Sequence, residues 1–295
     1  MTDKEILDTP INKLANGRVK SFSAYLLGML TSELRKKGIK FTPQVWCSTD
    51  WFSPDGEPGF AYPFYILEPR LKKIYLDYFY ELEGLDENEL IKLLRHECAH
   101  AIDNAYGFRK LKNRQKLFGT TSTPYPDSYK LNKNKNNYIE NLGEGYGMSH
   151  PDEDWAETFA VWLSEEDPMP GSDISRAKFE YVQEVAIKYL LESPVKWKRV
   201  KRLDNIFEFK MSFGEYIKLR KSEYKKILKN PPELGLSKNN LYKKVRESEQ
   251  SKERAIIIAR NLFNVCDPLS NYSGKPMNFV MEKMTKLHGL DQVIM

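Results

Sequence analysis

The sequence has few cysteines and histidines and no long hydrophobic run. Its 295 residues include three cysteines, which form no C-x-x-C pair, so a zinc knuckle and a dithiol redox motif are excluded. No stretch approaches the roughly 18 apolar residues that span a bilayer. Residues 1–13 carry charges where a signal peptide would have an apolar core. We therefore expect a cytoplasmic protein with reduced thiols and no membrane contact.

The composition excludes several special classes of protein. Hydrophobic residues make up 41% of the chain and charged residues 29%, as in ordinary globular proteins. The 16 glycines and 16 prolines are too few for a collagen or a wholly disordered chain. A chain of 295 residues is long enough to bury a real core and to form one large or two small domains.

Charge is unevenly distributed along the chain. Residues 1–170 contain 21 Lys and Arg against 26 Asp and Glu, a balance of −5. Residues 171–295 contain 25 against 15, a balance of +10. A basic region can indicate a nucleic-acid partner, but Lys-rich helices with a solvated face give the same balance and are the favoured interpretation.

The first half of the chain is predicted to mix helices and strands. Helical spacing of apolar residues predicts helices over 22–37 and 87–106, the second capped by Asp86. Three segments rich in aromatic and β-branched residues are expected to be strands of one small mixed sheet: 44–47, 60–67 and 72–82. A turn signal, S-P-D-G at 53–56, separates the first two strands. Together these elements predict an α+β fold class.

The second half is predicted to be mainly helical. Residues 107–147 lack periodicity and form a long connection, and a helix is expected from Pro151 to Ser164. Helical periodicity then recurs in four segments: 173–191, 213–229, 237–263 and 276–288. We expect the chain to divide into residues 1–205 and a helical, basic accessory region, 206–295.

The motif with the clearest chemistry is R-H-E-C-A-H at residues 95–100. On a helix, His96 and His100 are one turn apart and share a face, so both imidazoles can reach one metal ion. Glu97 is rotated by roughly 100° from His96, which suits a general base that contacts a water molecule instead of the metal. The pattern is typical of a zinc peptidase.

A zinc peptidase needs a third protein ligand. The extended H-E-x-x-H-x-x-G-x-x-H motif is excluded, because Asp103 and Tyr106 occupy its glycine and histidine positions. Within residues 146–160 we favour Glu157 as the third ligand, because a carboxylate on the partly buried side of an aromatic-rich helix needs a partner. His150 is the alternative ligand. The acidic residues 152–154 are explained by their favourable interaction with the helix dipole.

Other side chains near these candidates have possible supporting roles. Asp103 and Asp154 are candidates for orienting the ligand imidazoles, although either is equally explained as a surface charge. The oxyanion of a tetrahedral intermediate needs a hydrogen-bond donor. His150 and Tyr146 precede the expected third ligand and are both candidate donors, with His150 preferred.

These features resemble a known family. A His-Glu-x-x-His helix followed by a distant Ala-Glu-x-Phe-Ala helix is similar to the gluzincin metallopeptidases, and more closely to a bacterial family of putative zinc-binding metallopeptidases. The matching stretches lie between residues 43 and 203: 51–56, 63–65, 96–106, 118–126 and 149–163. The resemblance implies a zincin-like core in residues 1–205, with Zn²⁺ held by His96, His100 and Glu157 and with Glu97 as base. It also implies that 118–126 belongs to the fold.

The sequence therefore predicts a zinc-dependent enzyme that hydrolyses a peptide or amide bond in a peptide or protein substrate. The expected strand 72–82 is a candidate for binding the substrate backbone by strand addition. One alternative is a DNA-associated zinc protease, which would need a third histidine, and beyond residue 150 the chain has only His288. Another is a zinc-binding interaction module without catalysis. No sequence feature indicates the oligomeric state.

Overall fold

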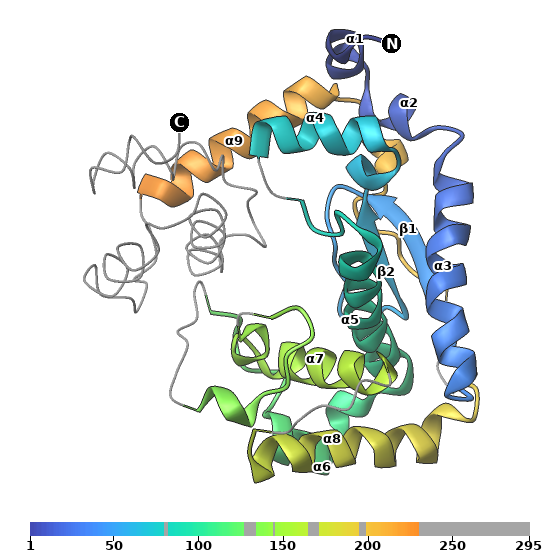
Figure 1. The fold of residues 1–295 in the computed structure, drawn as a ribbon, viewed down its shortest axis with the longest axis vertical. Helices are drawn as coiled ribbons and strands as arrows, with labels where there is room; N and C mark the ends of the chain where they lie inside the picture. The colour runs from blue at the N-terminus through green and yellow to red at the C-terminus, as the bar shows by residue number, and fades with distance from the viewer. Residues whose placement is uncertain (80–81, 127–133, 144, 165–170, 195–198, 230–295) are drawn as a thin grey trace, which may run out of the picture. The chain divides into compact units, whose positions relative to one another are not determined.

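The computed structural model describes residues 1–79, 82–126, 134–143, 145–164, 171–194 and 199–229 (Figure 1). The chain divides into two compact units. The first comprises Met1–Lys72, Glu83–Pro126 and Leu131–Phe213, and the second comprises Lys73–Leu82, Asp127–Lys130 and Gly214–Met295. Every residue of the candidate site lies in the first unit. The expected boundary after residue 205 stays a prediction, because most of 206–295 lies outside the described residues.

The described residues are mostly helical and include one small sheet, so the fold is broadly α+β. The α-helices and strands are α1 Asp3–Asp8, α2 Ile11–Ala15, α3 Val19–Lys36, β1 Gln44–Ser48, β2 Gly59–Pro63, α4 Pro69–Phe79, α5 Glu87–Tyr106, α6 Lys112–Phe118, α7 Pro151–Ser164, α8 Asp173–Val185 and α9 Phe213–Lys229. Short 3-10 turns are η1 Phe64–Ile66, η2 Phe108–Lys110, η3 Lys135–Asn137, η4 Tyr146–Met148 and η6 Ile206–Glu208, and α8 continues into a π-helical turn, η5 Ala186–Leu190.

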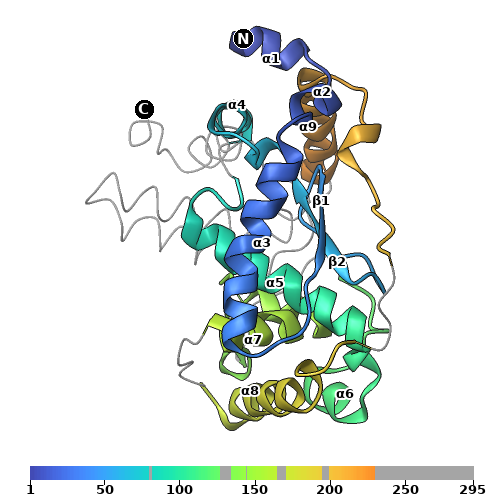
Figure 2. The ribbon, with the colours of Figure 1, turned by 90° about the vertical axis from the view of Figure 1, so that its right-hand side faces the viewer.

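The sheet has two parallel strands in the described part of the chain. Gln44 pairs with Gly59, and a Cβ at residue 59 would collide with the Gln44 carbonyl, so only glycine fits this close approach. Phe52 adds an isolated antiparallel bridge to Ala61. Helix α3 packs on β1 and α5 packs on β2, as the two views of the ribbon show (Figure 2). The sheet thus supports the helix that carries the histidine motif.

The prediction of a third strand over residues 72–82 is wrong. Residues 72–79 belong to helix α4, which begins at Pro69, a residue favoured at the first helical position. Leu71, Ile74, Tyr75 and Phe79 recur at helical spacing, and all four are buried. The aromatic content had favoured a strand, but the spacing of the apolar residues is that of a helix. A helix has no free strand edge, so residues 72–79 cannot bind a substrate backbone by strand addition. The expected strand over 60–67 also ends early, at Pro63, where η1 begins.

The two helices of the site form as the sequence predicts. The side chain of Asp86 accepts a hydrogen bond from the Glu89 backbone N–H at the start of α5. Helix α5 ends before Gly107, which has a φ of 71° and closes the helix in the left-handed conformation. Helix α7 begins at Pro151 and packs across α5 (Figure 1), and the fully buried Trp155 donates to the Ala99 carbonyl.

The described part of the connection from residue 107 to residue 147 has more regular structure than expected. It contains helix α6, which the sequence analysis missed, and α6 packs against α7 and α8. The predicted turn at 53–56 is held by Asn104 at the end of α5. Its side-chain amide donates to the carbonyls of Pro54 and Glu57 and accepts from the Gly56 N–H. The loops around the sheet are therefore tied to the metal-site helix.

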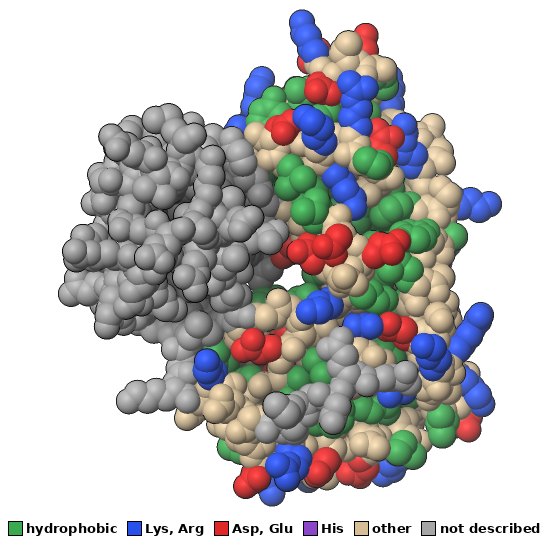
Figure 3. All heavy atoms as spheres, viewed as in Figure 1, with side chains coloured by type: hydrophobic (Ala, Val, Ile, Leu, Met, Phe, Trp, Pro, Cys, Tyr) green, Lys and Arg blue, Asp and Glu red, His purple; other side chains and the backbone are tan. Residues whose placement is uncertain are grey.

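The helices expected after residue 171 are confirmed as far as the structure describes them. Helices α8 and α9 match the predicted segments 173–191 and 213–229, while 237–263 and 276–288 lie outside the described residues. Among the described helices, none is long and apolar enough to cross a membrane. On the face drawn in Figure 3, the coloured Lys and Arg side chains are scattered among acidic and hydrophobic ones instead of forming one field.

Candidate metal centre

Helix α5 presents two histidines from one face. His96 and His100 are buried, with 3% and 9% of their surfaces exposed, and their Nε2 atoms lie 3.1 Å apart. Their rings meet edge to face, with centroids 4.8 Å apart. The i, i+4 spacing therefore brings two imidazole nitrogens to one point, as the motif predicts.

Helix α7 supplies a carboxylate to the same point. Glu153 Oε2 lies 3.0 Å from His96 Nε2 and 3.3 Å from His100 Nε2. These three atoms form a nearly equilateral triangle of possible ligand atoms. In a tetrahedral zinc site with bonds of about 2.0–2.1 Å, two ligand atoms lie about 3.3 Å apart. The edges of the triangle fit that spacing.

The hydrogen bonds of His96 also indicate that a cation belongs between the three atoms of the triangle. Its Nδ1 lies 2.8 Å from Glu157 Oε1, so the Nδ1–H donates to that carboxylate. A neutral ring then has a lone pair at Nε2, which faces an oxygen of Glu153. Burial lowers the pKa of His96, but Glu153 and Glu157 together raise it well above its ordinary value. Either a second proton or a metal ion must occupy this position, and two histidines with a carboxylate are a donor set that zinc accepts.

Glu157 occupies a different position from the one the sequence analysis gave it. Its Oε1 accepts from His96 Nδ1, and its Oε2 accepts from the backbone N–H groups of Asn141 and Leu142. Both oxygens are therefore engaged on the side of the ring away from the triangle. The structure places Glu153, one helical turn earlier, where the third ligand was expected.

Glu97 lies beside the triangle, and one of its two carboxylate oxygens has no hydrogen-bond partner among the described residues. It is 7% exposed, and its Oε2 is buried with no hydrogen bond. Burial raises the pKa of Glu97 to about 7, although the nearby His96 and His100 oppose that shift. A carboxylate whose pKa lies near neutrality can both accept and release a proton, which is what general acid–base chemistry requires.

Of the two candidate oxyanion donors, only Tyr146 is brought to the triangle. Its ring centroid lies 5.5 Å from that of His96, and burial and the charges of Glu153 and Glu97 raise its pKa well above the ordinary value. His150 is buried nearby, but both its ring nitrogens are used locally. Nε2 donates to the Thr123 carbonyl at 2.7 Å, and Nδ1 accepts from the Asp152 N–H at 3.1 Å.

The aspartates considered for orienting the imidazoles pair with cations instead. Asp103 accepts from Arg114 and from the backbone N–H of Arg109, while Asp154 accepts from Lys178 Nζ at 2.6 Å. Burial raises the pKa of Asp154 to about 7, against the effect of Lys178. The orienting role falls to Glu157, whose carboxylate holds the Nδ1–H of His96.

Two functional residues were missed by the sequence analysis. Glu153 was attributed to a helix-dipole effect, although its spacing of four from Glu157 gave both residues the same helix face. Tyr125 donates from its hydroxyl to Glu153 Oε1 at 2.7 Å, and no local pattern had indicated it.

A His-Glu-x-x-His helix that meets a carboxylate from a second helix is an arrangement that zinc hydrolases use, and the three side chains here could hold a metal ion. Residues 85–221 match the model of a family described as "Putative zinc-binding metallo-peptidase". The matched part of the chain contains α5, α7 and every residue of the triangle. No curated protein and no solved structure matches the chain.

Proposed function

We propose that the protein is a zinc-dependent peptidase with a zincin-like core. The observation that carries the proposal is the triangle of His96, His100 and Glu153 beside the unpaired carboxylate of Glu97. The two histidines and Glu153 would hold the ion. Zinc bound there would supply Lewis-acid chemistry toward a peptide carbonyl and a water molecule. A cytoplasmic location stays a prediction from the sequence.

Three residues around the triangle have separate roles in the proposed reaction. Glu97 accepts a proton from the attacking water at its unpaired Oε2 and later delivers it to the leaving amine. Tyr146, whose raised pKa keeps its proton in place, donates a hydrogen bond to the carbonyl oxygen as negative charge develops there. Glu157 holds His96 in a fixed tautomer and orientation.

The proposal is tested with Glu97→Gln. Because the amide cannot take up the proton, we expect peptide hydrolysis to fall at least about 100-fold, while zinc stays bound at about one ion per chain. Hydrolysis is measured by mass spectrometry on a mixed peptide library, and zinc by elemental analysis of the same sample. Glu87→Gln, at the solvent-facing start of the same helix, is the control and keeps full activity. Unchanged hydrolysis in Glu97→Gln would exclude Glu97 as the base.

A further inference from the structure

The segment of residues 119–126 lies along the start of helix α7. Gly119, with a φ of 100°, packs so closely that a Cβ would lie 3.0 Å from Pro151 Cγ. Two residues later, Thr121 Oγ1 donates to Asp152 Oδ1 at 3.1 Å. The carbonyl of Thr123 then accepts from His150 Nε2. The segment therefore contacts the N-terminal end of α7, which carries Glu153, at every second residue.

Tyr125 completes this series of contacts. Its hydroxyl donates to Glu153 Oε1 at 2.7 Å, while the other oxygen, Oε2, faces the two imidazoles. Its ring stacks on His150, with centroids 3.7 Å apart and planes 11° from parallel. The residue as a whole is 58% exposed. A surface tyrosine thus reaches the carboxylate of a buried site with its hydroxyl alone.

His150 serves as the platform for that ring. Because Nδ1 accepts from the Asp152 N–H and Nε2 donates to the Thr123 carbonyl, the imidazole has one tautomer and one orientation. A ring held in this way fixes the plane of the tyrosine stacked on it. The direction of the Tyr125 hydroxyl is therefore determined by the fold before any ligand binds.

We propose that Tyr125 is a positioning residue of the metal site, which acts by occupying Oε1 of Glu153. A free carboxylate has about four lone-pair directions and can rotate or chelate with both oxygens. When Tyr125 holds Oε1, only Oε2 faces the two imidazoles. Glu153 is then fixed before the metal binds, so binding does not have to pay the entropy of fixing it. The proposal rests on the function proposed above, in which Glu153 is a ligand.

The test compares Tyr125→Phe with Tyr25→Phe. The first removes the hydroxyl and keeps the stacked ring. The second removes a surface tyrosine hydroxyl that also donates to a glutamate, Glu87 Oε1 at 2.8 Å, away from the site. Loss of an outer partner of a metal ligand typically weakens metal affinity by about 10–100-fold. We expect a loss of about 10-fold for Tyr125→Phe and none for Tyr25→Phe, measured by zinc titration against a chromophoric chelator.

A spectroscopic readout separates positioning from a general loss of structure. With Co²⁺ in place of zinc, Tyr125→Phe should change the visible absorption bands, while the thermal unfolding of the metal-free protein stays as in wild type. Wild-type affinity and wild-type cobalt bands in Tyr125→Phe would overturn the positioning role, as would an equal loss in Tyr25→Phe. Glu153→Gln distinguishes the two proposals. If it binds zinc like wild type, the ligand set itself is wrong, whatever Tyr125 does.

Discussion

Helices α5 and α7 enclose two clusters of buried charge, and the two clusters are neutralised differently. In the metal cluster, α5 supplies His96 and His100, and α7 supplies Glu153 and Glu157. In the ion-pair cluster, α5 supplies Asp103 and α7 supplies Asp152, and both meet Arg114 of α6. The same pair of helices therefore holds carboxylates in both places, and α6 adds an arginine to the second cluster.

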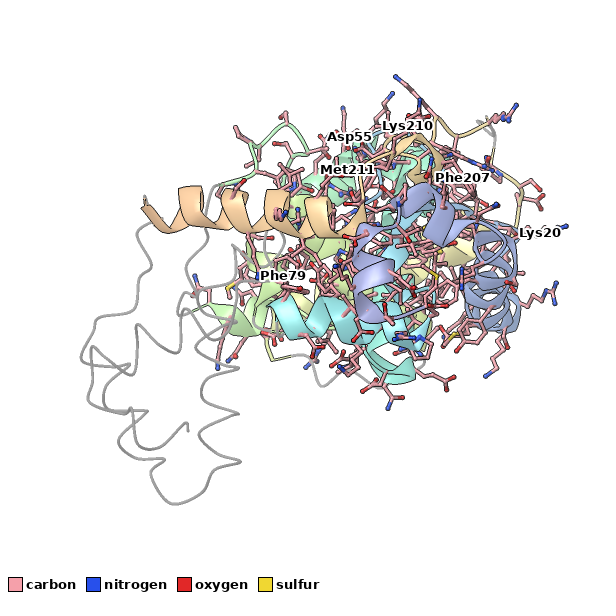
Figure 4. The ribbon with its side chains drawn as sticks, turned by 90° about the horizontal axis from the view of Figure 1, so that it is seen from above. Lys20, Asp55, Phe79, Phe207, Lys210 and Met211 are labelled. Atoms are coloured by element: carbon pink, nitrogen blue, oxygen red, sulfur yellow. The ribbon has the colours of Figure 1, made fainter. Side chains whose placement is uncertain are left out.

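The ion-pair cluster contains its own cations. Arg114 is fully buried and lies 2.6 Å from Asp152 and 3.2 Å from Asp103. Arg109 extends the cluster outward to Asp55, labelled in Figure 4, whose side chain is 88% exposed. The guanidinium of Arg114 also lies 5.6 Å from the ring of Trp155, which favours a cation at that depth. The carboxylates of this cluster thus have protein cations beside them, although Arg114 Nε and Nη1 are buried without a hydrogen-bond partner among the described residues.

The metal cluster has no such cation among the described residues. The ion pairs of Glu153 and Glu157 in this part of the chain are with histidines, and Glu97 has a buried oxygen without a partner. Burying carboxylates without a counter-charge is costly. The fold thus places arginine beside one cluster, whereas the other has the charge that the proposed metal ion would neutralise.

The largest effect is expected for Glu153→Gln on metal binding. Structural zinc sites with four ligands are worth about 10–16 kcal/mol, so one ligand is worth about 2.5–4 kcal/mol. We expect zinc affinity to fall by about 1,000-fold, which corresponds to about 4 kcal/mol. The measurement is a chelator competition titration. Glu140→Gln, an acidic site outside the triangle, is the control.

The free energy of unfolding of Glu153→Gln, with and without zinc, tests the difference between the two clusters. Without metal, Glu153→Gln should lose only about 1–2 kcal/mol, because the amide oxygen can still accept a hydrogen bond from a protonated imidazole in place of the carboxylate. Adding zinc at about 1,000 times its Kd should stabilise wild type by about 4 kcal/mol and leave the variant nearly unchanged. If metal-free Glu153→Gln unfolded far more easily than wild type, Glu153 would be a structural group instead of a ligand.

The second effect concerns the fold itself. Arg114→Met leaves Asp103 and Asp152 with Arg109 as their remaining cation, at the longer distances of 3.5 and 4.0 Å. Breaking a buried ion pair on one side costs about 3 kcal/mol or more, so we expect about that loss in the free energy of unfolding, with or without zinc. Denaturant titration measures it. Arg176→Met, on the exposed side of α8, is the control, and a loss below about 1 kcal/mol would show that the cluster is not needed for stability.

The sequence was sufficient for the two helices of the candidate site and for the two histidines of the triangle. The caps of α5, Asp86 and Gly107, and the i, i+4 histidines depend on local geometry, which a sequence displays directly. The wrong strand at 72–82 arose because aromatic residues suit both helices and strands, and there the spacing should have decided.

The choice between Glu153 and Glu157 could not be made from local pattern. Both carboxylates lie on one face of α7, one turn apart, and either could have met the imidazoles. The packing of α7 against α5 decides which one reaches the Nε2 atoms, and that register depends on contacts such as Trp155 with Ala99. The contact of Tyr125 with Glu153 could not be predicted either, because the two residues are 28 apart in the sequence and meet only through the fold.

The third prediction tests that choice directly. In Glu157→Gln, the side-chain NH₂ group would meet the Nδ1–H of His96 or the backbone N–H groups of Asn141 and Leu142, so one contact becomes donor against donor. We expect zinc affinity to fall by about 10–100-fold, measured in the same titration. The loss should be smaller than in Glu153→Gln. The opposite order would make Glu157 the ligand, as the sequence analysis had preferred.

The smallest effect is expected at His150, the residue that the sequence analysis favoured as oxyanion donor. Because both its nitrogens serve the 119–126 segment and the α7 backbone, His150→Gln should cost about 1 kcal/mol of stability and change zinc affinity by at most about 3-fold. Its hydrolysis of the peptide library should fall far less than in Tyr146→Phe, for which loss of an oxyanion donor predicts about 100-fold. If His150→Gln lost as much activity as Tyr146→Phe while it kept its zinc, His150 would have to turn from Thr123 toward the substrate during the reaction.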